Sequence, residues 1–235
     1  MQYIPVKTRT MKPPQDDLFS LLDESLVDVK EGDVILITSK IVSIHEGRCK
    51  KIGEGDIQKI REEGAQLVIP RNYWKSPLTA INNNFVSSSG IDTSNGDGHI
   101  IQLPIDPFAS AEKIYQYFAK RFGLKNLGII ITDSRSQLLR YGATGCAIAW
   151  WGIDPLVSHR GKEDLFGKTM NVARSNLVDG LAAGAVVVMG EVAEAQPIVI
   201  AKDIPNLSFT DKNTKDKLFT EFEDDTFRVL YEKWL

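Results

Sequence analysis

The chain has 235 residues, of which 43% are hydrophobic and 25% charged, with 28 Lys and Arg against 31 Asp and Glu. This composition argues against a disordered, collagenous or coiled-coil chain, and a net charge of −3 gives no basic field for a nucleic-acid polymer. The apolar runs fall short of the roughly 20 residues that span a bilayer, and no apolar signal segment follows the basic N-terminus. We therefore expect a cytoplasmic protein without a membrane or nucleic-acid partner, with Cys49 and Cys146 reduced.

The first half of the chain contains one clear strand and one clear helix. Residues 33–38 form a continuous apolar run typical of a buried strand. The charged, glycine-bearing segment 50–70 predicts a short exposed helix flanked by loops. Apolar residues recur at three- and four-residue spacing over 109–122, which predicts a helix with Ser110 as its cap and Gly123 at its end.

The second half continues the alternation of strands and helices. Residues 127–132 and 197–201 are predicted strands, and the alanine-rich stretch from about 171 to 187 is a predicted helix. A polar connection, 202–225, leads to alternating apolar residues over 226–235, which suggest an edge strand. The pattern indicates a mixed α/β or α+β fold. Without a repeat or linker, one domain is expected, with two lobes as the alternative.

Two polar clusters follow predicted structure in the N-terminal half. Thr38, Ser39 and Lys40 come directly after the first strand, where hydroxyls and an ammonium suit phosphate oxygens; the alternative is an ordinary turn with a solvated lysine. Asp92 opens a glycine-rich loop with hydroxyl and amide oxygens, which suits a hard cation, although an Asx-turn has the same pattern. An EF-hand is excluded because Leu103 stands where the bidentate glutamate is needed.

Two further clusters lie in the C-terminal half. Asp133 and Ser134 follow the strand 127–132 at a frequent metal-ligand position, and the alternative is that Asp133 caps the next segment and pairs with Arg135. Glu191 lies between the last predicted helix and strand, where a merely solvated glutamate is the alternative. Convergence of three carboxylates, Asp92 among them, would require a divalent metal.

Several common catalytic motifs are missing from the sequence. It contains neither GxxxxGK[ST] nor GxGxxG, so a Walker-type phosphate loop and a dinucleotide fingerprint are excluded. A GxSxG elbow is also missing, and His45, His99 and His159 show no zinc-ligand spacing. Any phosphate site must therefore be built differently.

Six short motifs in order over residues 6–200 resemble the coenzyme F-420 gamma-glutamyl ligase family. They are TSKIVSIHEGR, GIDTSN, LPIDPFASAEKI, IITDSR with LRYG, HRGKEDLFGK, and VVVMGE followed by PIVI. The resemblance implies an α+β, mixed-sheet fold that forms an intertwined homodimer, with one ligase domain over 1–235 and a C-terminal extension over 202–235.

The resemblance also implies a reaction. An enzyme of this family uses GTP to join L-glutamate in γ linkage to the deazaflavin coenzyme precursor, a phosphorylated acid, by way of an acyl phosphate. A divalent metal, magnesium or manganese, and room for a monovalent cation are implied with it. The implied metal ligands are Asp92, Asp133, Ser134 and Glu191. The implied nucleotide contacts are Thr8, Arg9, Thr10, Met11, Ser39, Lys40, Asn95, Met189, Gly190 and Gln196.

On chemical grounds we predict that Arg140 and Lys40 stabilise the charge of the transferred phosphoryl group. The chain departs from the family at Ile44, where a lysine is usual, and at residues 136–139, which replace a glycine- and arginine-rich stretch. These departures leave two alternatives: the same ligase chemistry on a different acid acceptor, or a nucleotide- and metal-binding protein without catalysis.

Overall fold

The central element of the fold is a five-stranded sheet, seen in a computed structural model that describes residues 1–55, 57–73 and 75–235. The strand order is β1-β12-β2-β8-β9, in which β2 and β8 are parallel and the other neighbours antiparallel. The strands are β1 (Gln2–Val6), β2 (Val34–Thr38), β8 (Gly128–Ser136), β9 (Ala143–Trp151) and β12 (Ile198–Lys202). This mixed sheet confirms the α+β prediction.

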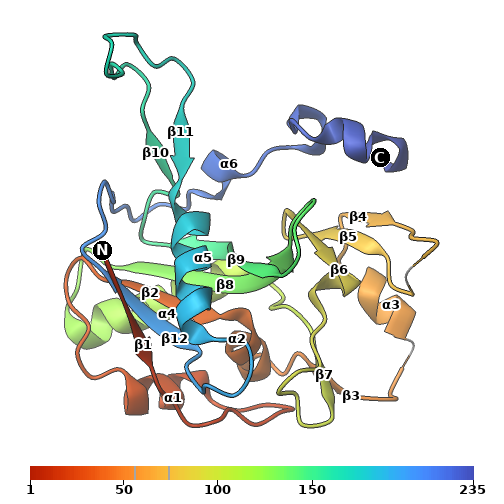
Figure 1. Ribbon diagram of the computed structural model, residues 1–235. Helices are drawn as coiled ribbons and strands as arrows, with labels where there is room; N and C mark the ends of the chain where they lie inside the picture. The colour runs from red at the N-terminus through yellow and green to blue at the C-terminus, as the bar shows by residue number, and fades with distance from the viewer. Residues whose placement is uncertain (56, 74) are drawn as a thin grey trace.

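Helices cover both faces of the sheet because the buried side chains of its strands alternate. In β2, Ile35 and Ile37 pack with α1 (Leu18–Ser25), α2 (Ser39–His45) and α4 (Pro107–Phe122), whereas Leu36 packs with α5 (Leu177–Met189). Figure 1 shows α5 in front of the sheet and α4 behind it. No helix of the described residues is long and apolar enough to cross a bilayer.

A β-bulge alters the pairing of β8 and β9. The register shifts between Ile131 and Thr132, which leaves Ile148 of β9 as an extra residue. The N–H of Ala147 at the bulge donates to Oδ1 of Asp179 at 2.8 Å, so α5 satisfies it. Beyond the bulge β8 runs on to Ser136, so the predicted strand end at residue 132 is wrong: pairing with β9 extends the strand past its apolar run.

Two predicted helices are present with different starts. Helix α4 begins at Pro107 and is capped by Asp106, whose carboxylate accepts from the N–H of Ala109 at 3.0 Å, so Ser110 is not the cap. Its end at Gly123, with φ 68°, is confirmed. Helix α5 begins at Leu177, not near residue 171, because the Asn176 side chain caps it and the residues before it pair in a hairpin.

Smaller elements lie beside the central sheet. They are β3 (Cys49–Lys51) with β7 (His99–Ile101), the sheet of β4 (Leu67–Ile69), β5 (Leu78–Ile81) and β6 (Asn84–Ser87), and the hairpin of β10 (Leu156–Ser158) and β11 (Arg174–Asn176). Helix α3 (Ile57–Glu62) confirms the helix expected within 50–70, in which Asp56 lies outside the described residues. Both cysteines are free, and Cys146 is buried in the core. That all 235 residues act as one ligase domain stays a prediction.

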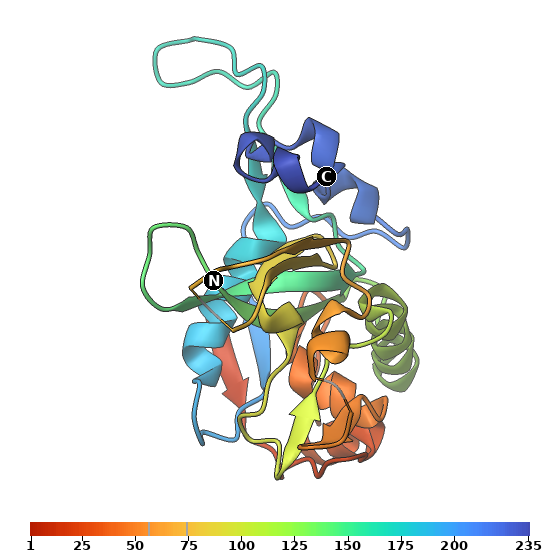
Figure 2. The ribbon, with the colours of Figure 1, turned by 90° about the vertical axis from the view of Figure 1, so that its right-hand side faces the viewer.

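The predicted C-terminal edge strand is wrong. After α6 (Lys215–Leu218), residues 219–235 form the 3-10 turns η2 (Phe222–Asp224), η3 (Arg228–Leu230) and η4 (Glu232–Trp234), above the β4-β5-β6 sheet in Figures 1 and 2. Only Tyr231 of the alternating apolar residues is buried, where it packs on Leu67 and Ala80 and donates to Asp225 at 2.7 Å. Phe227 and Val229 are exposed, so these alternating apolar side chains do not pack together against the core as one face of a strand would.

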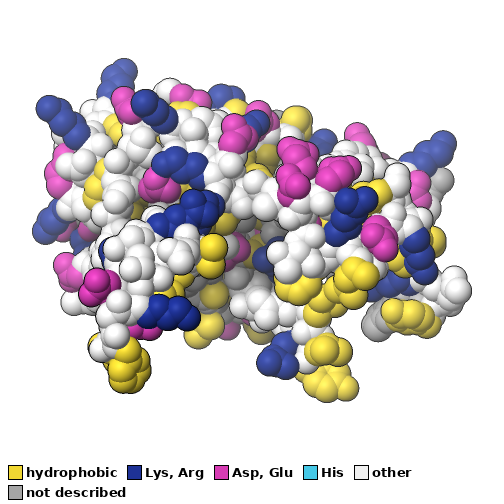
Figure 3. Space-filling model, turned by 90° about the horizontal axis from the view of Figure 1, so that it is seen from above, with side chains coloured by type: hydrophobic (Ala, Val, Ile, Leu, Met, Phe, Trp, Pro, Cys, Tyr) yellow, Lys and Arg dark blue, Asp and Glu magenta, His cyan; other side chains and the backbone are white. Residues whose placement is uncertain are grey.

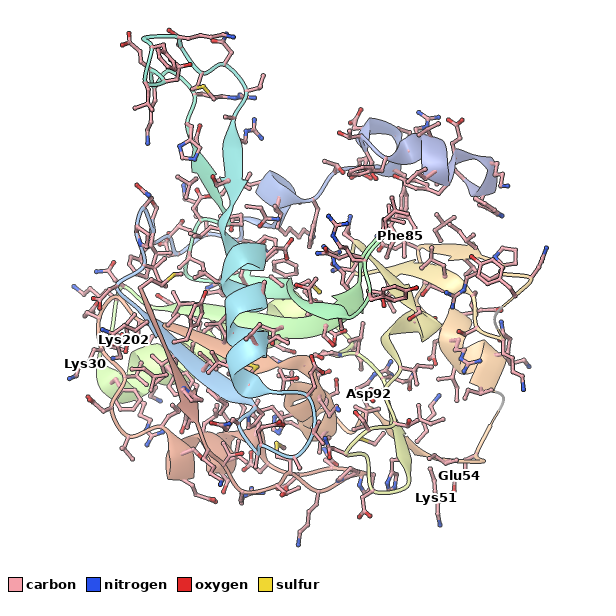
Figure 4. The ribbon with its side chains drawn as sticks, in the orientation of Figure 1. Lys30, Lys51, Glu54, Phe85, Asp92 and Lys202 are labelled. Carbon is pink, nitrogen blue, oxygen red and sulfur yellow. The ribbon has the colours of Figure 1, made fainter. Side chains whose placement is uncertain are left out.

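An ion pair with a buried carboxylate joins the residue before β2 to the last residue of β12 and gives a stability prediction. The Asp33 carboxylate, 6% exposed, accepts from Nζ of Lys202 at 2.9 Å and from the N–H of Lys30 at 2.9 Å (Figure 4). Lys202→Met leaves this buried carboxylate without its cation, so urea denaturation should show a loss of about 2–3 kcal/mol. Lys30→Met keeps the backbone donor and removes only an exposed pair with Asp28, so it should change stability by less than about 0.5 kcal/mol. Equal effects of the two variants would contradict the assignment.

Candidate functional site

A cavity of ≈ 340 Å³ lies at the end of β2 where α2 begins. Five segments form it: the residues after β1, the start of α2, the loop before β7, the middle of β8, and the loop between α5 and β12. Nearly all of the predicted site residues line it, and they are Thr8, Arg9, Thr10, Met11, Ser39, Lys40, Asp92, Asn95, Asp133, Ser134, Met189, Gly190, Glu191 and Gln196.

Parallel pairing brings two of these clusters together. Thr38 at the end of β2 pairs with Thr132 of β8, so Ser39 and Lys40 follow one strand beside Asp133 on the other. Asp133 lies two residues after Ile131, which faces α2, so strand alternation directs it toward the same helix. Sequence separation of more than 90 residues thus becomes proximity at one edge of the sheet.

Lys40 binds the loop before β7. Its ammonium lies 2.6 Å from Oδ2 of Asp92 and donates to the carbonyl and hydroxyl oxygens of Ser94, each at 2.9 Å. The predicted Asx-turn is also present, because the N–H of Ser94 donates to Oδ1 of Asp92 at 2.7 Å. Burial disfavours the Asp92 carboxylate, but hydrogen bonds from Lys40 and Ser94 outweigh it and hold the pKa of Asp92 below its usual value. Lys40 is therefore not the solvated lysine of an ordinary turn.

Asp133 lies within β8, against the cavity. The residue is partly exposed because it lines the cavity, whereas its carboxyl is almost surrounded by protein. This burial raises the pKa of Asp133 from 3.8 to about 7; the N–H of Ser134 offsets it in part, and the charges of Asp92 and Glu191 add to it. The alternative that Asp133 pairs with Arg135 does not hold, since Arg135 donates to Asn84 at 2.5 Å and lies 3.9 Å from Asp179.

The loop after α5 forms one rim of the cavity. It is tied down by Asn95, whose amide donates to the carbonyl of Val192 at 2.8 Å, and by Thr8, whose N–H donates to the carbonyl of Ala195 at 3.0 Å. Gly190 ends α5 with φ 79° and ψ 175°, a conformation that essentially only glycine adopts, and a Cβ there would meet the Glu194 side chain. The rim is thus a fixed turn with Glu191 exposed on it.

The carboxylates of the cavity are the candidate ligands of the divalent metal that was predicted from the sequence. Among residues 1–55, 57–73 and 75–235, no three His, Cys, Asp or Glu side chains surround one point closely enough to hold an ion. Asp92 and Glu191 nevertheless both act on the Asp133 carboxyl, and one of them already binds an ammonium. Three carboxylates and the Ser134 hydroxyl on one cavity are oxygen donors of the kind that Mg²⁺ or Mn²⁺ takes. These donor types are ones that a divalent cation takes, but in this structure no three of the described acidic side chains surround one point, and Asp92 is paired with Lys40.

Arg140, the other predicted catalytic residue, lies elsewhere. It follows β8 in the exposed turn over residues 137–142, donates to the carbonyl of Leu139, and does not line the cavity. The turn projects from the body of the protein as the green loop in Figure 2. In this structure Arg140 is therefore not positioned to act on a group bound in the cavity.

Two of the cavity residues that were not predicted from the sequence carry a buried side-chain oxygen that is unpaired within the described part of the chain. Ser43 of α2 and Gln102, just after β7, are buried, and the Ser43 hydroxyl and the Gln102 carbonyl oxygen are without a hydrogen-bond partner among the described residues. Ser43 stands inside the motif TSKIVSIHEGR and so carried a signal. Nothing local in the sequence marks Gln102.

Arg9 is held in the cavity wall by an acidic partner, which gives a pH prediction. The Arg9 guanidinium donates two hydrogen bonds to the Asp16 carboxylate, at 2.7 and 3.1 Å. The backbone N–H groups of Lys12 and Asp17 also donate to the Asp16 carboxylate. The Arg9 hydrogen bond, opposed by burial and aided by those N–H groups, lowers the pKa of Asp16 from 3.8 to about 2. Because the folded pKa is depressed, this stabilisation is present above about pH 4 and is lost as the pH falls through 2.

Asp16→Asn should therefore cost about 1–2 kcal/mol of unfolding free energy near pH 6 and almost nothing near pH 2. Urea titrations of both proteins across that range measure the difference. Asp28→Asn, at an exposed carboxylate paired with exposed Lys30, is the matched control and should give a small, nearly constant difference. A cost for Asp16→Asn that does not change with pH would exclude the ion pair as its cause.

Comparison with known proteins places these features in a family. Residues 56–203 match the sequence profile of the family described as F420-0:Gamma-glutamyl ligase. A Coenzyme F420:L-glutamate ligase of Methanocaldococcus jannaschii is 36% identical over 222 residues, which cover 92% of this chain and 86% of the relative. Proteins of the same name from Halorubrum lacusprofundi (30% identical, 93% of this chain, 92% of the relative) and Archaeoglobus fulgidus (27%, 100% and 99%) also match.

Proposed function

This chain belongs to the F420-0:gamma-glutamyl ligase family and is a ligase, and from that premise we propose that it adds L-glutamate in γ linkage to the deazaflavin coenzyme F-420 precursor, using GTP and a divalent metal ion. The observation that carries the proposal is the single cavity onto which the phosphate-binding residue types and the carboxylates both open. The reaction needs both the phosphate-binding residues and the carboxylates. An anionic nucleotide and anionic carboxylates repel each other unless a cation lies between them.

The residue types of the cavity suit activation of a carboxylic acid. The carboxylate to be extended, which is the γ-carboxylate of a glutamyl residue where the linkage is γ, attacks the γ-phosphorus of GTP, and GDP leaves. The glutamate amine then attacks the resulting acyl phosphate and loses a proton as phosphate departs. Residues 8–11, Ser39 and Lys40 would hold the phosphates, and Asn95 with the fixed loop 189–196 would contact the nucleotide. Asp92, Asp133, Ser134 and Glu191 would hold a divalent ion, which supplies charge neutralisation for the phosphoryl group when bound.

An isotope experiment tests this mechanism. If the acceptor carboxylate is phosphorylated, ¹⁸O in that carboxylate must appear in the released inorganic phosphate, one atom for each amide formed. Phosphate without ¹⁸O in a reaction that still forms the amide would exclude the acyl phosphate. Replacing GTP by ATP in the same assay decides the nucleotide.

A different acid acceptor is a second candidate for one specific reason. Residues 136–139, where the sequence departs from the family, lead into the exposed turn that carries Arg140. This turn does not line the cavity. A departure at this turn lies outside the residues that line the cavity and is compatible with a different acid. Turnover with glutamate and GTP that requires an acid other than the deazaflavin precursor would favour this candidate.

We also propose that the protein forms a homodimer and that it lies in the cytoplasm. Two projecting apolar tips support the dimer. Leu139 and Tyr141 at the β8–β9 turn and Leu165 and Phe166 at the β10–β11 tip are almost fully exposed, and Figure 3 shows hydrophobic side chains at the projecting ends of the surface. Sedimentation equilibrium should give twice the chain mass for the natural protein. Leu165→Ser with Phe166→Ser should shift the mass toward that of one chain, and an unchanged dimer would show that this tip is not in the interface.

A further inference from the structure

We propose that Lys40 serves as a substitute cation on Asp92, so that Lys40 and a divalent ion compete for the same carboxylate oxygen. Phosphate oxygens arriving in the cavity then draw the ammonium away and release Asp92 to the metal. Lys40 is in this view a positioning residue that couples metal binding to nucleotide binding. The inference rests on the proposed function, since it concerns the same cavity.

The contacts of Lys40 are those of a fully bound cation. An ammonium has three N–H donors, and Lys40 finds three oxygens: Oδ2 of Asp92 at 2.6 Å and the two oxygens of Ser94 at 2.9 Å. The Ser94 hydroxyl in turn donates to Oδ2 of Asp92 at 3.0 Å, and its N–H to Oδ1. Both carboxylate oxygens are thus occupied by protein donors, and a metal can reach Oδ2 only if these donors move.

The lysine is the partner that can move. Asp92 is fixed through its backbone, which exchanges two hydrogen bonds with Ile101, at 2.9 Å and 2.8 Å, and lies between the central sheet and β7 (Figure 4). Lys40 reaches Asp92 from α2 through a flexible four-carbon stem, and the Lys40 side chain is 21% exposed. Exchange of ligands on Asp92 therefore needs new side-chain rotamers of Lys40 and a turn of the Ser94 hydroxyl, with the main chain unchanged.

Charge decides the direction of the exchange. In this structure Lys40 neutralises Asp92, one of the carboxylates that act on Asp133. Phosphate oxygens offer the ammonium several charge-assisted acceptors in place of one carboxylate oxygen. Once Lys40 has turned to them, Asp92 is free for a cation, and by linkage metal and nucleotide each strengthen the binding of the other.

Mn²⁺ binding to the nucleotide-free protein, followed by the EPR signal of the free ion, tests the competition. Lys40→Met keeps the length of the stem and removes the competitor, so its Mn²⁺ dissociation constant should fall about fivefold to tenfold. Arg9→Gln removes a positive charge from the wall of the same cavity without touching Asp92, and it should lower the constant less than about twofold. Asp92→Asn in the Lys40→Met background should abolish the gain.

Each alternative outcome is decisive. Equal Mn²⁺ affinities of the natural protein and Lys40→Met would overturn the competition while leaving the metal-dependent ligase intact. An equal gain in Arg9→Gln would also overturn it, because net charge alone would then explain the effect. Absence of Mn²⁺ binding in every variant at millimolar metal would overturn the proposed metal site itself.

A measurement on the unaltered protein covers the case in which Lys40→Met fails to fold. With ¹⁵N-labelled lysine, the Lys40 ammonium resonance is identified by its loss in Lys40→Arg. Addition of Mg²⁺ should move that resonance toward the position of exposed lysines. An unmoved resonance at saturating Mg²⁺ would contradict the exchange.

Discussion

Asp133→Asn should lower kcat for amide formation about a thousandfold or more while the protein stays folded. The substitution keeps the shape of the side chain but removes a carboxylate that lines the cavity and on which the charges of Asp92 and Glu191 both act. Under the proposed function, a divalent ion would then lose an oxygen ligand, and the phosphoryl group would lose most of its charge stabilisation. Steady-state rates with saturating nucleotide and metal measure the loss.

The control for this prediction comes from the loop that contains Asp92. Asp97→Asn changes an exposed carboxylate that does not line the cavity, and it should keep the natural rate. Asp133→Asn should also unfold at a temperature no lower than that of the natural protein, since the amide removes an unfavourable buried charge. Near-normal turnover of a folded Asp133→Asn protein would exclude the metal role of this residue.

Gly145→Ala should cost about 2–4 kcal/mol of unfolding free energy and weaken nucleotide binding together with it. A Cβ at Gly145 of β9 would lie 2.4 Å from the carbonyl oxygen of Ala182 in α5, a backbone atom that a rotamer change cannot displace. The helix must move away from the sheet, and its C-terminal end carries Met189 and the rim of the cavity. Urea denaturation and a nucleotide titration on the same preparation measure both effects.

The matched control for Gly145 lies on the helix itself. Gly180 of α5 has no atom within 4 Å of an added Cβ, and Gly180→Ala should leave stability unchanged or raise it by up to about 1 kcal/mol through helix propensity. A neutral Gly145→Ala variant would show that α5 can shift on the sheet without cost. The close approach would then not be what positions the rim.

Most of the residues named from the sequence line the cavity, because these polar residues lie next to strongly patterned elements. The apolar run of β2 predicts a buried strand, and a buried strand predicts that Ser39 and Lys40 emerge at its end. Parallel pairing with β8 then brings Asp133 to the same edge, which is a property of the fold and not of either motif. The family resemblance added residues 8–11, which no local pattern marks as a site.

Other features depended on tertiary structure and were missed or misplaced. The contact between Lys40 and Asp92 joins residues 52 positions apart, and neither sequence environment specifies it. The continuation of β8 through Asp133 comes from pairing with β9 past a bulge, which apolar patterning does not record. The alternation over 226–235 indicated a strand. In the structure only Tyr231 of these alternating apolar residues is buried, and the segment forms 3-10 turns.

The central claim is tested most directly by the mass of the product. Purified protein incubated with the deazaflavin precursor, L-glutamate, GTP and Mn²⁺ should yield a species heavier by one glutamyl residue, with one GDP released for each amide formed. Omission of GTP or of the metal should stop the reaction. A folded protein that gives no such product, or that forms it equally well without nucleotide, would contradict the account.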